Sequence, residues 1–177
     1  MAVTALATAV SGLGAPRRVQ AMPIPFMYSG IPVIPDASIP MSGISQPYWG
    51  WAGGPASIRI NPDHWAIMPE GAQQFLLDHE RGHWALGHNT QYSSSIPLAQ
   101  KEWDADTFAA RAMMRRGQRA LLDQHIRWLR WLAVAGPSPL PQYAPWPVQA
   151  DHLLAVEAEF ANPFPPLGRA APRTPSR

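Results

Sequence analysis

Two histidines and a glutamate near the middle of the chain have the types and spacing of a metal-dependent hydrolase. Residues 79–83 read H-E-R-G-H, an H-E-x-x-H pattern, within a segment predicted to be helical. His79 and His83 lie one helical turn apart, about 40° from each other around the axis, so both imidazoles can reach one ion. Glu80 is offset by one residue, which suits it to hold a water beside the metal. The pattern predicts hydrolysis that depends on zinc, with Glu80 as the catalytic base.

A catalytic zinc takes three protein ligands, so a third must come from elsewhere in the chain. The sequence has no cysteine, which leaves histidine and carboxylate side chains. His88 is nine residues after His79 and would lie on the opposite side of the helix, so we expect it to make a helix-end contact instead. Eighteen residues separate His83 from Glu102, enough for a loop and the first turn of an antiparallel helix. Asp106, one turn after Glu102, is placed to accept the free ring N–H of a ligating histidine.

These side chains require two adjacent helices and a short sheet to hold them. Residues 57–60 alternate polar and apolar side chains, which predicts a strand, and residues 61–63 predict a turn. Amphipathic spacing and terminating glycines predict helices over about 69–87, 98–116 and 119–135, with a shorter one at 148–160. Gly82, Ala105 and Ala109 would let the first two of these helices approach closely. The fold class predicted is mainly α (α+β), with the short sheet ahead of the H-E-x-x-H helix.

The 21 prolines divide the chain into three parts. Eight fall in residues 1–55 and ten in 137–177, so only three interrupt the stretch between them. We therefore expect a compact metallopeptidase domain over 56–136, between a Pro/Gly-rich N-terminal arm (1–55) and a Pro-rich C-terminal arm (137–177) that carries the short helix. The N-terminal arm keeps many aromatic and branched side chains, so we expect it to lie extended over the surface of the domain.

Charge and hydropathy narrow the range of partners. The formal net charge is only +2, and we interpret a group of arginines on the second and third predicted helices as a solvated helix face, not a nucleic-acid surface. The apolar stretch at 1–14 is too short to span a membrane. Residues 1–20 are a candidate targeting segment, which favours a secreted or periplasmic location over a cytoplasmic one. The expected partner is a peptide or protein substrate; the sequence does not give the oligomeric state.

Two blocks of the sequence resemble a known family of zinc peptidases. Residues 79–88, H-E-R-G-H-W-A-L-G-H, and 102–109, E-W-D-A-D-T-F-A, resemble the gluzincins, and within them the CaaX prenyl endopeptidases and their heat-shock membrane relatives. The resemblance covers about 55 residues and implies a zincin-like domain with one Zn²⁺ per chain, Glu102 as the third ligand and Asp106 supporting a ligand. The spacing of the blocks is similar to that of thermolysin-like gluzincins, so a minimal soluble form is implied. By analogy with the family, the substrate would pair with an edge strand, for which the candidate is Ser57, Ile58, Arg59 and Ile60.

The group that stabilises the oxyanion is left open by the sequence. Candidates are Tyr143, His125, His152 and Tyr92, although the helical spacing of apolar residues around His125 is more typical of a core histidine. Three functions are compatible with these residues. The first is a zinc endopeptidase, the second is a non-catalytic binding or assembly module stabilised by zinc, and the third is a latent peptidase blocked by its own arms.

Overall fold

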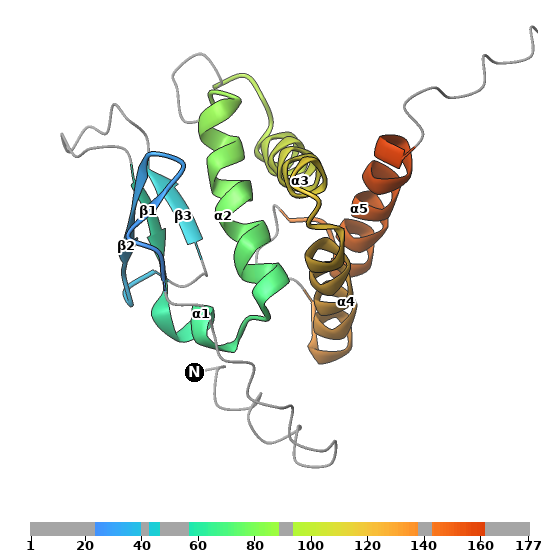
Figure 1. The fold of residues 1–177 in the computed structure, drawn as a ribbon, viewed down its shortest axis with the longest axis horizontal. Helices are drawn as coiled ribbons and strands as arrows, with labels where there is room; N and C mark the ends of the chain where they lie inside the picture. Colours follow the sequence, from blue (N-terminus) through green and yellow to red (C-terminus); the bar gives the residue numbers. More distant parts are fainter. Residues whose placement is uncertain (1–23, 40–42, 47–56, 89–93, 138–142, 162–177) are drawn as a thin grey trace, which may run out of the picture.

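The computed structural model describes residues 24–39, 43–46, 57–88, 94–137 and 143–161, and these form a small sheet followed by five helices (Figure 1). The predicted fold class, mainly helical with a short sheet ahead of the H-E-x-x-H helix, is confirmed. Among the described residues, no helix is both long enough and apolar enough to cross a bilayer. The candidate targeting segment at 1–20 lies outside the described residues.

The sheet contains four strands: β1 (Met27–Tyr28), β2 (Ile31–Pro35), β3 (Gly43–Gln46) and β4 (Ser57–Ile60). Their order is β1-β2-β4-β3, and β4 pairs parallel to β2 and antiparallel to β3. The first three strands come from the segment expected to be an extended arm, which therefore forms most of the sheet. The predicted strand at 57–60 is present as β4.

The proposed substrate-binding role of Ser57, Ile58, Arg59 and Ile60 is wrong. Strand β4 lies inside the sheet, and its two neighbours already use its backbone hydrogen-bonding groups. Three of its side chains, Ser57, Ile58 and Ile60, are buried. A substrate cannot pair with a strand that is occupied on both sides.

The helices are α1 (Pro62–Ile67), α2 (Glu70–Ala85), α3 (Leu98–Arg115), α4 (Arg119–Ala135) and α5 (Trp146–Ala161). Four of them match the predicted helices to within about two residues. Helix α1 was not predicted, because the residues expected to form a turn instead cap a helix. The Asn61 side chain accepts hydrogen bonds from the backbone N–H groups of Asp63 (2.9 Å) and His64 (3.3 Å), and Pro62 occupies the first helical position.

Helix α2 lies between the sheet and the other long helices (Figure 1). On one side, Leu77 joins a core with Val33, Ile58 and Trp65 of α1. On the other side, Phe75 joins the larger core formed by α3, α4 and α5. Helix α2, which carries the H-E-x-x-H motif, is therefore buried on two faces.

Helices α2 and α3 approach closely at Gly82, within the motif itself. A Cβ atom at this position would lie 3.1 Å from Cδ1 of Phe108 and 3.3 Å from Cα of Ala105, tighter than ordinary van der Waals contact. Ala105 and Ala109 are fully buried. The small residues therefore allow the close approach expected of them.

Asp78, which precedes the first histidine of the motif, connects α2 to neighbouring elements. Its side chain is 0% exposed, so its charge requires partners. It accepts hydrogen bonds from the Tyr28 hydroxyl (2.5 Å) and from Gln74 (3.2 Å), and it forms an ion pair with Arg116. These contacts join β1 and the end of α3 to α2.

Helix α5, within the predicted C-terminal arm, is part of the core. Ala150, Leu153 and Val156 are buried against α3 and α4, and Glu157 forms an ion pair with Arg119. This packing brings the chain just before α5 toward α3, where Tyr143 and Ala144 line a cavity together with Glu102.

Candidate metal centre

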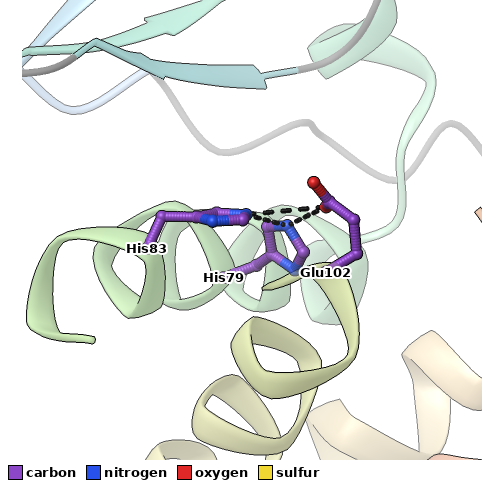
Figure 2. Close-up of side chains that lie close together, drawn as sticks. All are labelled: His79, His83 and Glu102. Carbon is purple, nitrogen blue, oxygen red and sulfur yellow. Dashed lines mark hydrogen bonds and ion pairs between the residues drawn. The ribbon is translucent and has the colours of Figure 1, made fainter. Parts of the chain in front are cut away.

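Three side chains from two helices meet at one point (Figure 2). His79 and His83 project from α2, and Glu102 projects from the beginning of α3. The Nε2 atoms of the two histidines are 3.0 Å apart, and Oε2 of Glu102 lies 3.2 Å from His79 Nε2 and 3.5 Å from His83 Nε2. Within the described residues, this is the cluster of ligand-type side chains that could hold a metal ion.

The separations fit a tetrahedral ion. Zinc binds imidazole nitrogen and carboxylate oxygen at about 2.0–2.2 Å, so two ligand atoms of a tetrahedral site lie about 3.3 Å apart. The three distances here span this value, and all three side chains are buried. Two imidazoles and a carboxylate are also a ligand set that suits a divalent transition metal. The site can therefore accept such an ion with little rearrangement.

The electrostatics of the cluster also favour a cation. Burial would lower the pKa of His79, but hydrogen bonds with Asp106 and Glu102 outweigh burial and raise it well above its usual value. Burial would raise the pKa of Glu102, but hydrogen bonds with His79 and His83 hold it well below its usual range. Both shifts are in the direction that stabilises a positive charge between these groups. A bound metal would replace the proton in this position.

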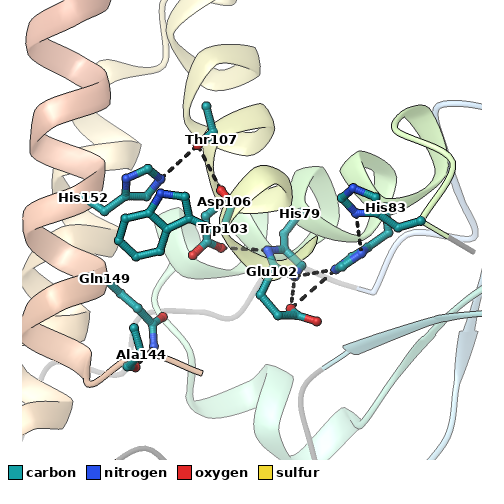
Figure 3. Close-up of polar contacts among 10 residues, drawn as sticks. His79, His83, Glu102, Trp103, Asp106, Thr107, Ala144, Gln149 and His152 are labelled. Atoms are coloured by element: carbon teal, nitrogen blue, oxygen red, sulfur yellow. Dashed lines mark hydrogen bonds and ion pairs between the residues drawn. The ribbon is translucent and has the colours of Figure 1, made fainter. Parts of the chain in front are cut away.

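Asp106 fixes the ring of His79, as the sequence predicts. Its Oδ1 atom lies 2.8 Å from Nδ1 of His79 (Figure 3). With a metal in place of the proton on Nε2, Nδ1 would donate its hydrogen to Asp106 and Nε2 would offer its lone pair to the ion. Helices α2 and α3 are antiparallel here. The earlier histidine, His79, therefore lies next to the later acid, Asp106, and His83 lies next to Glu102. One turn of α3 therefore supplies both a ligand and the support of another ligand.

Replacement of Asp106 by alanine is expected to weaken metal binding by about 10- to 100-fold, because the His79 ring loses its fixed tautomer and orientation. Asp104→Ala, on the same helix, is the matched control, since Asp104 accepts a hydrogen bond from Gln100 (2.8 Å) outside the cluster. Competition with a chromophoric chelator would measure both affinities. Equal affinities for the two variants would refute the role of Asp106.

His88 makes the helix-end contact predicted for it and also supports a ligand, which the sequence did not reveal. Gly87 adopts φ +70°, which turns the chain back, and the backbone N–H of His88 donates to the carbonyl of His83 (2.9 Å). The Nδ1 atoms of the two rings are then 3.1 Å apart. With Nε2 of His83 kept for a metal, its Nδ1–H donates to His88. The Gly-His pair at the helix end was the only available signal.

Glu80 lines a cavity of about 270 Å³ beside the cluster, together with His79, Asp106 and Tyr143. Its side chain is only 5% exposed. It does not belong to the group of converging ligand atoms. The carboxylate is therefore available to a molecule in the cavity next to the metal position, as the offset of one residue along the helix predicts.

Tyr143, a candidate from the sequence, lies at the site. It borders the cavity that Glu80 lines and a second one lined by Glu102. Burial raises its pKa above the usual value, and the Glu102 carboxylate raises it further through its charge and a hydrogen bond. The phenol therefore keeps its proton at neutral pH and can donate a hydrogen bond.

The other candidates differ from Tyr143 in position. His125 lines the cavity, but its ring stacks on Phe75 with centroids 3.9 Å apart, and burial followed by the charge of His79 lowers its pKa to about 3. His152 lies outside the cluster, where it stacks on Trp103 and hydrogen-bonds with Thr107 at 2.9 Å (Figure 3). Tyr92 lies outside the described residues.

Comparisons of this chain with protein-family models, with curated proteins and with solved structures give no significant match. The functional assignment therefore depends on the site itself: a His-His-Glu cluster able to hold a metal ion, with an adjacent buried carboxylate and an adjacent phenol.

Proposed function

We propose that this protein is a zinc metallopeptidase of the gluzincin type that cleaves internal peptide bonds. The observation that carries the proposal is the convergence of His79, His83 and Glu102, with Glu80 lining a cavity beside them. A site that only stabilises a fold needs no carboxylate between its two histidines. The His-His-Glu set with a position left open for water is the arrangement of a catalytic zinc.

When bound, zinc lowers the pKa of a water and polarises a carbonyl group. Glu80 accepts a proton from the attacking water and then passes it to the leaving amine. The Tyr143 hydroxyl donates a hydrogen bond to the oxygen on which negative charge develops. Asp106 and His88 hold the two histidine rings in the orientation that turns each Nε2 toward the metal position.

The substrate is proposed to lie along β3 instead of β4. Strand β3 is at the end of the sheet order, pairs only with β4 among the described strands and contacts α2. In Figure 1 it is the strand drawn beside α2, the helix that carries the motif. An extended peptide added to this edge would pass beside the metal cluster, with its backbone held by strand pairing.

The proposal predicts that the full chain, loaded with one zinc, cleaves a chemically unfolded protein. Chelation should abolish cleavage, and added zinc should restore it. Zinc content and fragment formation, followed by mass spectrometry, measure both effects. A fully metallated protein that cleaves nothing across a broad peptide library, and that loses thermal stability on chelation, would favour the zinc-stabilised binding module instead.

The hypothesis of latency stays a prediction for the parts of the arms that the structure does not describe. The described parts of both arms belong to the fold, since β1, β2 and β3 form the sheet and α5 joins the core. Removal of a whole arm would therefore damage the domain. Only truncation of residues 1–23 or 162–177 can test inhibition, and latency predicts higher activity after one of these truncations.

A further inference from the structure

The cavity beside Glu80 has two chemically different ends. One end is formed by His79, Glu80, Asp106 and Tyr143, next to the metal position. The remainder is formed largely by apolar side chains of α1, α2, α4 and α5. The cavity therefore leads from the reacting groups into an apolar interior, which is the usual composition of a small ligand pocket.

The apolar end is formed by side chains that no other part of the mechanism uses. Phe75 and Leu76 come from α2, Trp128 and Leu132 from α4, and Trp146 from α5. Ile67, on α1, also lines the cavity and is 70% exposed, so the cavity is open to solvent on that side. A side chain of a bound peptide can therefore enter the cavity from the solvent without displacing buried core residues.

The size of the cavity limits what it can hold. Its volume is about 270 Å³, whereas an apolar cavity of about 150 Å³ is sufficient for benzene. One large aliphatic or aromatic side chain fits this space. Complete burial of such a side chain contributes enough hydrophobic free energy to favour it over a small one by about tenfold or more.

The charges around the cavity limit the ligand further. Among the described residues, its lining contains no lysine or arginine, and its two acids, Glu80 and Asp106, are at the metal end. A carboxylate side chain of the substrate would meet like charges at the metal end and no lysine or arginine in the apolar part. A lysine or arginine side chain would place its charge in the apolar part, away from the two acids. An uncharged side chain has neither disadvantage.

One polar atom near the apolar part lacks a partner. His125 is 8% exposed, lines the cavity, and its Nδ1 atom has no hydrogen-bond partner among the described residues. Leaving a buried polar atom unpaired is costly. His125 lines the cavity, but this nitrogen is itself enclosed, so it places no requirement on a ligand there.

We infer that this cavity is the specificity pocket of the protein and that it binds one bulky, uncharged apolar or aromatic side chain of the peptide substrate. The inference rests on the proposed function, since it needs a peptide positioned at the metal. Selectivity is determined mainly by Trp128, Leu132 and Trp146, which come from helices outside the metal site.

The test measures binding instead of catalysis. Acetohydroxamic acid and a series of N-acetyl amino-acid hydroxamates, with phenylalanine, leucine, alanine or glutamate side chains, are titrated calorimetrically into the zinc-loaded full chain. The parent compound reports the metal alone, and the others add one side chain each. We expect the phenylalanine and leucine compounds to bind at least about tenfold more tightly than the alanine and glutamate compounds.

Two variants locate the pocket. Leu132→Arg places a charge on its wall, in the last turn of α4, where a cation suits the helix dipole. It should weaken binding of the phenylalanine compound by about tenfold or more and strengthen binding of the glutamate compound. The affinity for acetohydroxamic acid should not change. Leu132→Trp should narrow the pocket without a charge, which moves the preference from phenylalanine toward alanine. Val134→Arg, on the same helix but 89% exposed, is the control and should bind like the wild type.

The outcomes separate the inference from the proposed function. If acetohydroxamic acid binds but every side chain binds alike, or if Leu132→Arg behaves like Val134→Arg, the pocket is refuted and the metal site stands. If acetohydroxamic acid does not bind the zinc-loaded protein, the proposed function fails and the inference fails with it. A misfolded variant would no longer bind acetohydroxamic acid either. Tighter binding of the glutamate compound therefore cannot result from unfolding.

Discussion

Glu80→Gln is expected to lower kcat for peptide hydrolysis by about 10²- to 10⁴-fold, while the zinc content stays at one per chain. The amide has nearly the shape of the carboxylate but cannot accept a proton from water. Glu80 lines the cavity beside His79 without belonging to the cluster of ligand atoms, so its loss should affect proton transfer and not metal binding. Cleavage of a fluorogenic peptide, together with metal analysis of the same sample, measures both quantities.

Glu70→Gln is the matched control, because Glu70 lies in the first turn of the same helix and is exposed. This variant should retain the activity of the wild type. Full activity of Glu80→Gln would refute the mechanism. Loss of zinc from Glu80→Gln would instead show that the carboxylate binds the metal, which the geometry of the three converging ligands does not predict.

Tyr143→Phe is expected to lower kcat by about 10²- to 10³-fold with little change in KM or zinc content, because the variant lacks the donor to the developing oxyanion. Burial and the Glu102 carboxylate raise the pKa of Tyr143, so the wild-type phenol stays protonated as the pH rises above neutral. Deprotonation of Tyr143 should therefore cause no loss of activity between pH 7 and about pH 9. Steady-state kinetics across this range, on both proteins, measures these effects.

His125→Gln is the comparison for Tyr143→Phe, since both residues line the cavity and both were candidates from the sequence. His125 stacks on Phe75 and lines the cavity, and we expect its replacement to affect substrate binding more than kcat. A large loss of kcat in His125→Gln together with normal kcat in Tyr143→Phe would assign the oxyanion donor to His125 instead.

The metal cluster could be predicted from the sequence because its geometry is local. Four-residue spacing on a helix places His79 beside His83 whatever surrounds them, and the same spacing places Glu102 near Asp106. The eighteen-residue interval is just long enough for a return by an adjacent helix. Small residues at 82, 105 and 109 indicated which faces of the two helices would meet. Gly82 and Ala105 lie at the close contact, and Ala109 is fully buried.

The sheet could not be predicted because its pairing is not local. Strands β1 and β2 lie in a segment whose prolines suggested an extended arm. Strand β1 has only two residues, and β2 (I-P-V-I-P) contains two prolines, so neither shows a clear alternating pattern. The position of β4 inside the sheet depends on partners 20 or more residues away in β2, and no pattern within residues 57–60 reveals them. The edge-strand assignment failed for this reason.

Contacts that depend on the packing of distant elements were also beyond the sequence. His88 meets His83 only because Gly87 reverses the chain at the end of α2. Tyr143 reaches Glu102 only because α5 packs against α3 and α4. The sequence could therefore name Tyr143 only as one of four candidates. Its position at the site follows from the tertiary structure.

The most direct test of the metal site is a crystal structure of the full chain with data collected at the zinc absorption edge. An anomalous peak is expected about 2.0–2.2 Å from Nε2 of His79, Nε2 of His83 and a carboxylate oxygen of Glu102. Its height should correspond to one zinc per chain. A zinc bound elsewhere, or bound by the two histidines without Glu102, would contradict the site and the peptidase mechanism that depends on it.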